Sequence, residues 1–242
     1  MLRLEGITKT YAKGAVPAVT DLDLHVKRGE IFGFIGPNGA GKTTTIKMLC
    51  GILSPDAGSI TIGGVDLGKD PIAAKRNFCY VPDVHDTYDR LTGQEYLDFV
   101  ADVYGVGTKE RRERAEKYLN MFEIADAAGD RINTYSHGMK QKLLITAALI
   151  PAPPLWILDE PMTGLDPKAA ALLKDEMRVH TAEGNTVFFS THVLEVAEKL
   201  CDRIGIIRNG QLVAVGTLEE LRGGKDESLE KLFLELTEES DA

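Results

Sequence analysis

The sequence predicts an α/β fold in which a helical segment interrupts a series of alternating strands and helices. Along most of the chain, short apolar runs typical of buried strands alternate with segments whose apolar residues recur at three- and four-residue spacing. From about residue 83 to residue 150, only the helical spacing is found. At 242 residues, the chain suits one large domain or one domain with an insertion. We therefore expect residues 83–150 to form a helical subdomain inserted in an α/β core.

Most elements predicted before this insertion are strands. Residues 21–26 alternate polar and apolar side chains, as in a strand with one buried face. Residues 30–35 and 78–81 are short apolar runs, as in fully buried strands, and Pro82 ends the second of them. A further strand at 59–62 is followed by a glycine turn. A helix is predicted at residues 44–50.

The helices predicted from the insertion onward cover residues 93–104, 109–122, 136–150, 167–181 and 192–200. The strands predicted after the insertion cover residues 155–158, 187–189, 203–208 and 211–215. Pro167 is placed where proline favours a helix start, and Asn209-Gly210 is the sequence of a type I′ hairpin turn. Residues 217–242 are acidic, and we expect a short helical tail there, outside a main domain of residues 1–216.

The most informative motif runs from Gly36 to Thr43 and fits the pattern G-x-x-x-x-G-K-[ST] of phosphate-binding loops. Its glycines let successive backbone N–H groups point at one anion, Lys42 adds a positive charge, and the Thr43 hydroxyl suits Mg²⁺. A strand before the loop and a helix after it distinguish this motif from a chance match in a surface turn. The predicted nucleotide-binding residues are Gly36, Pro37, Asn38, Gly39, Ala40, Gly41, Lys42, Thr43 and Thr44.

Two acidic residues, Asp159 and Glu160, directly follow the apolar strand at residues 155–158. The carboxyl end of a parallel strand lies near the phosphate loop of its neighbour, so we expect Asp159 to hold Mg²⁺ opposite Thr43. Glu160 is then free to polarise an attacking water as general base. An acidic turn without a role is the alternative. His192 follows another predicted strand and is a candidate partner of Glu160 and the γ-phosphate.

With these motifs in this order, the chain resembles the ATP-binding cassette (ABC) ATPases, the nucleotide-binding subunits of ABC transporters. The resemblance covers about residues 2–216. The phosphate loop resembles the family's Walker A motif, and Asp159 with Glu160 resembles its Walker B motif and catalytic glutamate. His192 resembles the switch histidine, and Tyr11 lies where the family has an aromatic residue that stacks on adenine. The resemblance implies a P-loop NTPase core of the ABC ATPase type, an antiparallel β subdomain and an inserted α-helical subdomain.

Two further motifs carry the resemblance. The run from Ser136 to Gln141 is similar to the family signature, and the run from Gly164 to Asp166 is similar to the D-loop. In this family two domains close head to tail on two ATP molecules, each between one subunit's phosphate loop and the other's signature. The resemblance therefore implies that Ser136, Gly138 and Asp166 contact ATP. Ser136 would offer an N-cap hydroxyl and a helix N-terminus to a partner's γ-phosphate.

The activity implied is hydrolysis of ATP to ADP and phosphate with Mg²⁺, coupled to transport. The partners implied are a second ATPase subunit, identical or related, and a polytopic membrane subunit. The membrane subunit would dock on residues 83–104, where the side chains of Tyr88, Leu91, Tyr96 and Phe99 either line a groove or pack inside the subdomain.

The signature departs from the usual Leu-Ser-Gly-Gly-Gln, because Tyr135, His137 and Met139 replace its first, third and fifth residues. Ser136 and Gly138 are retained, so we expect a competent site. This variant resembles ATPases of ABC-2 type exporters, and we expect the chain to power such an exporter. An ABC ATPase doing mechanical or regulatory work on a membrane complex without transport is the alternative, and Glu160 with His192 argues against a third possibility, a subunit that only binds ATP.

Asp83 is a second departure, since the family usually has glutamine at this Q-loop position. Our hypothesis is that Asp83 is a direct or water-bridged Mg²⁺ ligand in the closed state, and an exposed loop acid is the alternative. The predicted metal ligands are thus Thr43, Asp83 and Asp159.

Composition excludes several other classes of protein. The net charge of −9 and the lack of a strongly basic segment argue against nucleic acid as a partner. No apolar run approaches the roughly 18–20 residues of a membrane span, and the first residues show no signal-peptide pattern. We therefore expect a cytoplasmic protein held at the inner face of the cell membrane by its partner. The three widely spaced cysteines suit a reduced, buried role.

Overall fold

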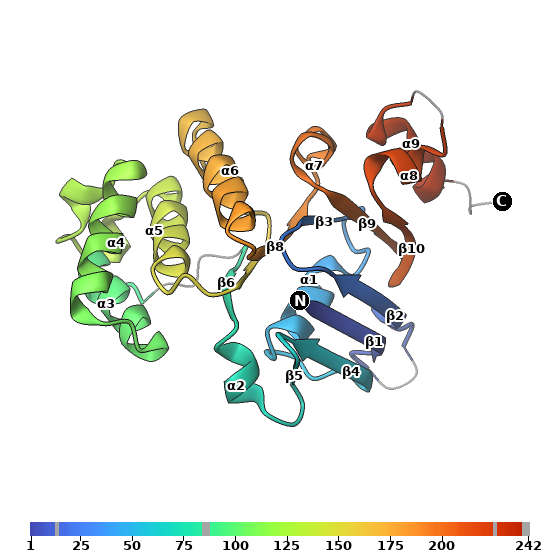
Figure 1. The fold of residues 1–242 in the computed structure, drawn as a ribbon, viewed down its shortest axis with the longest axis horizontal. Coiled ribbons are helices and arrows are strands. Elements are labelled where there is room, and N and C mark those ends of the chain that lie inside the picture. Colours follow the sequence, from blue (N-terminus) through green and yellow to red (C-terminus); the bar gives the residue numbers. More distant parts are fainter. Residues whose placement is uncertain (13–14, 84–87, 225–226, 239–242) are drawn as a thin grey trace.

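Two β-sheets form the centre of the molecule in the computed structural model, which describes residues 1–12, 15–83, 88–224 and 227–238 (Figure 1). One sheet is antiparallel, with the order β2-β1-β4-β5, and the other has the order β10-β9-β3-β8-β7-β6. In the second sheet only β10 is antiparallel to its neighbour. The strands are β1 (Leu2–Lys9), β2 (Val19–Val26), β3 (Ile31–Ile35), β4 (Ala57–Ile62), β5 (Val65–Asp66), β6 (Phe78–Val81), β7 (Leu155–Leu158), β8 (Thr186–Thr191), β9 (Arg203–Arg208) and β10 (Gln211–Gly216). The predicted α/β architecture with an antiparallel sheet is confirmed.

Most of the helices lie outside this centre, but the helix at Lys42–Leu49 packs between the two sheets (Figure 1). Figure 1 shows α3, α4 and α5 together at one end of the molecule, with α6 between them and the strands. The α-helices are α1 (Lys42–Leu49), α2 (Pro71–Lys75), α3 (Gly93–Tyr104), α4 (Thr108–Met121), α5 (His137–Leu149), α6 (Pro167–Ala182), α7 (Leu194–Leu200), α8 (Leu218–Arg222) and α9 (Leu229–Glu238). Short 3₁₀ turns occupy Ala125–Ala127 and Ile132–Thr134.

Local capping explains where the inserted helices begin and end. The Thr92 hydroxyl accepts a hydrogen bond from the Glu95 N–H, and the Glu95 carboxylate accepts one from the Thr92 N–H. This capping box starts α3, and Gly105, in the left-handed conformation, ends it. The predicted helices at 93–104, 109–122 and 136–150 match α3, α4 and α5 to within one residue at each end.

Two strands and one α-helix were not predicted. The strand β1 pairs with both β2 and β4 and is central to the antiparallel sheet, and its Leu2 and Leu4 are buried while Arg3 and Glu5 are exposed. That alternation is the period-2 pattern of a half-buried strand and was available in the sequence. The two-residue strand β5 and the five-residue helix α2 are too short to show any periodicity.

Both predicted turns are of the tight hairpin kind. Asn209 and Gly210 have φ angles of 47° and 77° and join β9 to β10, where Arg208 pairs with Gln211. Gly63 and Gly64 have φ angles of 61° and 87° and join β4 to β5. Positive φ at both central positions is the mark of a type I′ turn, which favours glycine and asparagine.

Two hydrophobic cores meet at strand β7. Trp156 and Leu158 point into the core that contains α3–α6, whereas Leu155 and Ile157 point into the core shared with α1 and the antiparallel sheet. This is the alternation expected of a strand buried on both faces. The carboxyl end of β7 therefore emerges between the helical part and the β part of the molecule.

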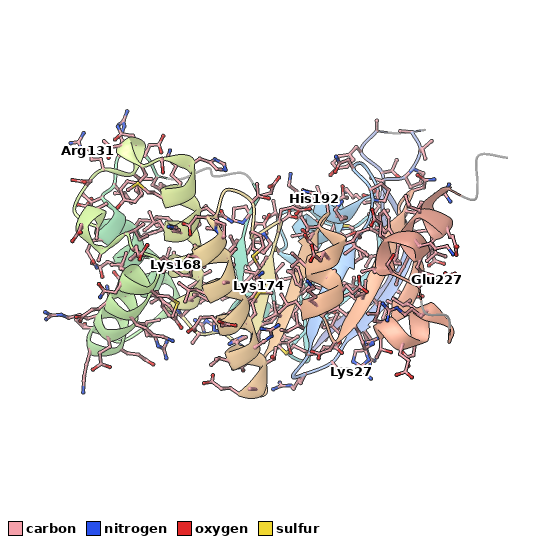
Figure 2. All side chains as sticks on the ribbon, turned by 90° about the horizontal axis from the view of Figure 1, so that it is seen from above. Lys27, Arg131, Lys168, Lys174, His192 and Glu227 are labelled. Atoms are coloured by element: carbon pink, nitrogen blue, oxygen red, sulfur yellow. The ribbon has the colours of Figure 1, made fainter. Side chains whose placement is uncertain are left out.

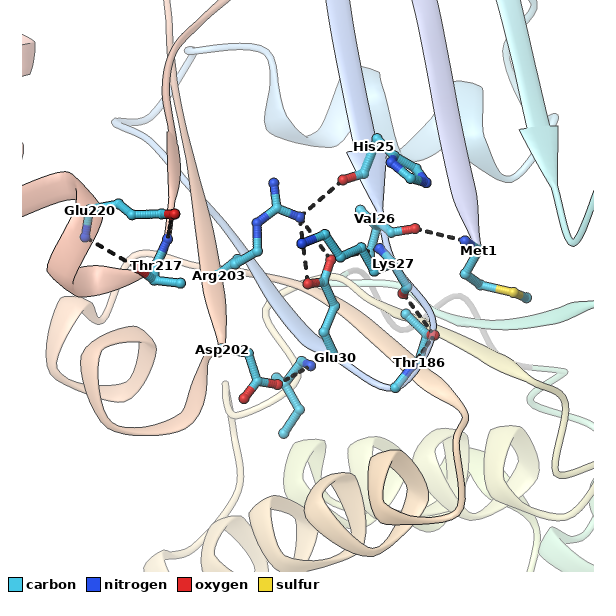
Figure 3. A network of polar contacts seen from close by, with 12 residues as sticks. Met1, His25, Val26, Lys27, Glu30, Thr186, Asp202, Arg203, Thr217 and Glu220 are labelled. Atoms are coloured by element: carbon cyan, nitrogen blue, oxygen red, sulfur yellow. Dashed lines mark hydrogen bonds and ion pairs between the residues drawn. The ribbon is translucent and has the colours of Figure 1, made fainter.

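A polar network fixes the start of β3, which leads into the phosphate loop (Figure 3). Arg203 pairs with the carboxylate of Glu30 at 3.1 Å and donates to the His25 carbonyl oxygen at 3.1 Å. The Asp202 carboxylate accepts a hydrogen bond of 2.7 Å from the Ile31 N–H. Because Glu30 is buried, its charge depends on Arg203 for a partner.

The described part of the acidic C-terminal segment, residues 217–224 and 227–238, packs against the rest of the protein. Leu229 of α9 is fully buried against a cluster that includes Ala197 of α7 and Ile206 of β9. Arg222 pairs with Glu198 at 2.6 Å, which also joins this segment to α7. Helices α8 and α9 thus support the helix that follows His192.

Candidate functional site

The loop between β3 and α1 closes around the ammonium group of Lys42. Lys42 Nζ donates to the carbonyl oxygens of Gly36 and Pro37, at 2.6 and 3.2 Å. Burial lowers the pKa of Lys42, and the nearby carboxylates of Glu160 and Asp159 oppose this shift. The lysine therefore lies near both acidic residues, and a phosphate would take the place of the two carbonyl oxygens.

Close packing explains the glycines of this loop. A Cβ atom at Gly36 would lie 2.4 Å from the carbonyl oxygen of Ile207, and one at Gly41 would lie 2.6 Å from that of Ala18. Gly41 also has a φ of 108°, which disfavours any other residue. The backbone can consequently wrap the loop tightly enough to hold an anion.

The rest of the predicted loop is accessible. Pro37, Asn38, Gly39 and Thr43 are exposed, whereas Ala40 is buried beneath them. The hydroxyl of Tyr11 lies 3.1 Å from Thr44 Oγ1 at the start of α1, so the structure brings this aromatic residue to the loop. Tyr11 is 64% exposed, which leaves a ring face free for a base.

Asp159 continues β7 beyond its last residue and is almost completely buried. Its N–H donates to the Val81 carbonyl oxygen, and its Oδ1 accepts a 2.6 Å hydrogen bond from Ser190 Oγ. Its Oδ2 is buried and has no hydrogen-bond partner in the described part of the chain. Burial raises the pKa of Asp159, which the Ser190 hydrogen bond opposes and the charge of Asp83 reinforces. A buried carboxylate oxygen without a partner is what a cation ligand requires before the cation binds.

Glu160 and His192 contact each other directly. Glu160 Oε2 lies 2.9 Å from His192 Nδ1, and the Glu160 N–H donates to Ser190 Oγ at 3.0 Å. Glu160 has a φ of 48°, an unusual conformation for a residue with a side chain, and such strain tends to concentrate at functional sites. Figure 2 shows His192 at one edge of the molecule, between the helical end marked by Arg131 and the strands.

The predicted signature forms the start of α5. Ser136 is the N-cap, because its Oγ accepts a hydrogen bond of 3.3 Å from the Met139 N–H. A Cβ atom at Gly138 would lie 2.8 Å from the Gly164 carbonyl oxygen, so Gly138 allows a close approach of two backbones. Asp166 caps α6 through the Ala169 N–H and pairs with Lys142 at 2.7 Å. The side chains of Ser136 and Asp166, both predicted to contact ATP, thus make hydrogen bonds or an ion pair within the chain in this structure.

Comparison with known proteins identifies the family. Residues 19–163, more than half of the chain, match the family described as ABC transporter, and the match includes the phosphate loop, Ser136 and Glu160. The chain belongs to the ABC transporter family.

Two similar proteins are named as ATP-binding proteins. The linearmycin resistance ATP-binding protein LnrL of Bacillus subtilis is 40% identical over 91% of this chain and 70% of LnrL. The ABC-type transporter ATP-binding protein EcsA of the same organism is 37% identical over 99% of this chain and 97% of EcsA.

Solved structures similar to this chain are also ATP-binding cassettes or subunits of ABC transporters. One ATP-binding subunit of an ABC transporter has a TM-score of 0.93 and 37% identity, covering 98% of this chain and 99% of its own. A dimeric ATP-binding cassette in a post-hydrolysis state with ADP and Pi has a TM-score of 0.81 and 26% identity, covering 90% of this chain and 99% of its own. This chain is therefore an ABC ATPase that binds and hydrolyses ATP as a transporter's ATP-binding subunit.

Gln141 is a residue of the ABC signature to which the sequence analysis assigned no role, and the structure connects it to the site. The side chain of Gln141 is buried, and its Nε2 donates to the Pro161 carbonyl oxygen at 2.9 Å. Gln141 thereby positions the residue that follows Glu160. Gln141 stands between Lys140 and Lys142, before the apolar run of α5, so the sequence carried no signal that its side chain is buried.

Asp83 lies two residues beyond β6 and is exposed. Its charge raises the pKa of Asp159, which places it near this ABC ATPase's buried carboxylate. Among the described residues, no group of three or more acidic, histidine or cysteine side chains is close enough to hold a metal ion. A hydroxyl ligand such as Thr43 is not of those types.

The aromatic residues predicted near the docking segment gather on one surface. Tyr88 and Phe99 are 59% and 46% exposed, and the Tyr88 ring lies 5.6 Å from that of Phe99 and 6.2 Å from that of Tyr96. Leu91 and Tyr96 are half-buried against the core of the ABC ATPase's helical part. Of the two alternatives, exposure on the surface thus applies to Tyr88 and Phe99, and packing inside the subdomain applies to Leu91 and Tyr96. None of the described helices is long and apolar enough to cross a membrane.

Proposed function

We propose that this ABC ATPase drives an exporter of the ABC-2 type from the cytoplasmic face of the membrane, and that it hydrolyses ATP as its Mg²⁺ complex. The observation that carries the catalytic part is the 2.9 Å contact between Glu160 and His192 beside Lys42. The signature with His137 and Met139 supports the exporter class, as does the similarity to LnrL, which is named for linearmycin resistance.

The donor set fits a magnesium ion. Asp159 Oδ2 is buried without a partner among the described residues, and the Thr43 hydroxyl is exposed on the facing loop. Both are hard oxygen ligands of the kind that Mg²⁺ prefers. We assign Thr43 and Asp159 to the metal, with Asp83 as a third, direct or water-bridged ligand. A magnesium ion held by these residues would supply positive charge next to the phosphates of ATP.

Glu160 is the proposed general base. A water attacks the γ-phosphorus and gives its proton to the Glu160 carboxylate, while the bond from the γ-phosphorus to the bridging oxygen of ADP breaks. His192 orients that carboxylate through Nδ1. Lys42 and the loop amides stabilise the charge that develops on the phosphate oxygens.

The phosphate loop supplies one half of the proposed site, and a second subunit supplies the other. Ser136 and Gly138 at the exposed start of α5 present a hydroxyl and helix N–H groups that suit the γ-phosphate of a partner's ATP. The dimeric cassette with ADP and Pi supports this arrangement. Loss of the γ-phosphate removes charge-assisted contacts and releases the two subunits.

Glu160→Gln tests the proposed base. We expect at least 100-fold slower hydrolysis, since general-base catalysis supplies about 10²–10⁴-fold, with nucleotide affinity retained. We also expect ATP to trap a dimer, measured by size-exclusion chromatography with light scattering. Glu195→Gln is the matched control, because Glu195 is an exposed glutamate on α7 that pairs only with Lys199 in the described contacts. Wild-type hydrolysis by Glu160→Gln would refute the assignment.

Asp83→Gln tests the third metal ligand. If Asp83 binds the ion, the Mg²⁺ concentration for half-maximal ATPase activity rises in this variant, because a charged ligand is lost. Asp89→Asn, a change to an acid of the same loop region that pairs with Lys140, should leave the Mg²⁺ dependence unchanged. An unchanged Mg²⁺ dependence of Asp83→Gln would eliminate Asp83 as a ligand.

The membrane subunit is proposed to dock on the aromatic surface of Tyr88, Tyr96 and Phe99. These rings are partly exposed and adjacent, which suits an apolar helix seated in a groove. Tyr88→Ala with Phe99→Ala should abolish copurification with a polytopic membrane protein while ATP binding is retained. Copurification at the wild-type level would contradict this docking site.

A further inference from the structure

The start of α5 encloses a glycine of the D-loop. A Cβ atom at Gly164 would lie 2.5 Å from His137 Cδ2 and 2.8 Å from Nε2, so the imidazole lies directly on the Gly164 α-carbon. The next residue, Gly138, approaches the Gly164 carbonyl oxygen so closely that a Cβ atom there would lie 2.8 Å from it. Two consecutive residues of α5 thus hold Gly164 from two directions.

Two polar contacts attach the same loop to the second turn of α5. Gln141 donates to the Pro161 carbonyl oxygen at 2.9 Å in a buried position. Lys142 pairs with Asp166 at 2.7 Å, and its side chain is only 14% exposed. The Lys142 hydrogen bond lowers the pKa of Asp166 to about 2, so the Asp166 carboxylate stays charged at neutral pH. Residues 161–166 are therefore fixed to α5 at both ends and in the middle.

We propose that His137 is a positioning residue which, together with the Lys142–Asp166 pair, joins the signature helix to the loop after Glu160. The inference rests on the proposed function, because Ser136 would contact a partner's ATP while Glu160 acts on the ATP of its own chain. The joined unit makes Ser136 and Glu160 move together, and so links the two nucleotide sites of the dimer. Glycine, the usual signature residue at this position, has no side chain to make this contact.

Hydrogen exchange in the nucleotide-free chain tests the joined unit without any dimer. The Thr163 N–H donates to the Glu160 carbonyl oxygen at 3.0 Å, and the Leu165 N–H donates to that of Met162 at 3.2 Å. We expect His137→Gly to accelerate exchange of these two amides about tenfold, since the loop loses its packing on one side. His137→Gln keeps most of the volume and should stay within about twofold of wild type.

A second variant separates loss of the contact from loss of the helix. Lys142→Met leaves helix propensity intact and should also accelerate exchange of the same amides, and exchange in the later turns of α5 should remain unchanged. Lys168→Met is the matched control, because Lys168 is a lysine of α6 that pairs with Glu123, in the loop after α4. Wild-type exchange at Thr163 and Leu165 in both His137→Gly and Lys142→Met would overturn the inference.

The dimer gives the functional readout. In the Glu160→Gln background, we expect His137→Gly to shorten the lifetime of the ATP-bound dimer about tenfold, while the affinity of a single chain for nucleotide is unchanged. An equal lifetime would refute the link between the sites. If Glu160→Gln forms no ATP-bound dimer at all, the proposed function fails, and the exchange experiment still decides whether His137 holds the loop.

Discussion

His180 should make this protein lose stability in mild acid. It lies on α6, is 4% exposed, and stacks on Trp156 with a centroid distance of 3.8 Å and an interplanar angle of 15°. Its Nε2 is buried and has no hydrogen-bond partner in the described part of the chain. Burial lowers the pKa of His180 from 6.5 to about 4. The neutral imidazole is therefore the form that the folded protein accepts.

The two pKa values of His180 determine the direction and the size of the change in the free energy of unfolding with pH. The folded pKa is below the unfolded one, so the unfolded chain takes up a proton first as the pH falls. The contribution of neutral His180 to the free energy of unfolding is complete above about pH 6.5 and is lost progressively as the pH falls to about 4. At pH 5 the loss is about 2 kcal/mol, and over the whole window it is about 3 kcal/mol.

His180→Phe isolates this contribution, because phenylalanine can keep the stack on Trp156 and cannot titrate. Urea unfolding of both proteins at pH 7.5 and pH 5.0 gives four free energies of unfolding. We expect wild type to lose about 2 kcal/mol more than the variant between the two pH values, since the other titrating groups cancel in the comparison. Equal losses would show that His180 protonates in the folded state as easily as in the unfolded one.

Three other changes test the structural account. Asp159→Asn removes a buried charge with one unpaired oxygen. Thermal denaturation of the nucleotide-free protein should therefore show a free energy of unfolding higher by about 1–3 kcal/mol, and ATPase activity should be lost. A lower melting temperature would contradict this expectation. Arg203→Met leaves the buried Glu30 carboxylate unpaired and should cost about 3–5 kcal/mol in urea unfolding, partly recovered by adding Glu30→Gln. Leu229→Ala should cost about 2–4 kcal/mol, whereas Leu234→Ala on the same helix, 44% exposed, should cost less than about 1.

Much of the fold was predictable because local patterns determine it. The glycine loop, the apolar strand before Asp159 and the Asn209-Gly210 turn each carry their geometry in a few adjacent residues. The helical insertion was predictable because its apolar residues keep one period over a dozen positions. The helix after the phosphate loop begins at Lys42, two residues before its predicted start, so the last two residues of the loop motif belong to the helix.

The contacts that join distant segments were not predictable. Gln141 and Pro161 are 20 residues apart, and Lys142 and Asp166 are 24 apart; their pairing depends on how α5 rests against the loop after β7. Periodicity indicates which face of a helix is buried, but not which residue it meets. The strained backbone of Glu160 likewise arises from tertiary contacts, since its N–H is held by Ser190 of another strand.

The position of β7 between two hydrophobic cores has a consequence for genetics. A core substitution that removes a methyl group next to Trp156 loosens the packing on one face of β7, and one next to Ile157 loosens the packing on the other face. Because interiors are closely packed, we expect either change to shift the carboxylates at the end of the strand. Substitutions that restore activity to a weakened Asp159 or Glu160 variant are thus expected in the interior on either side. A selection for such revertants would map how the protein's interior governs its chemistry, at positions that never touch ATP.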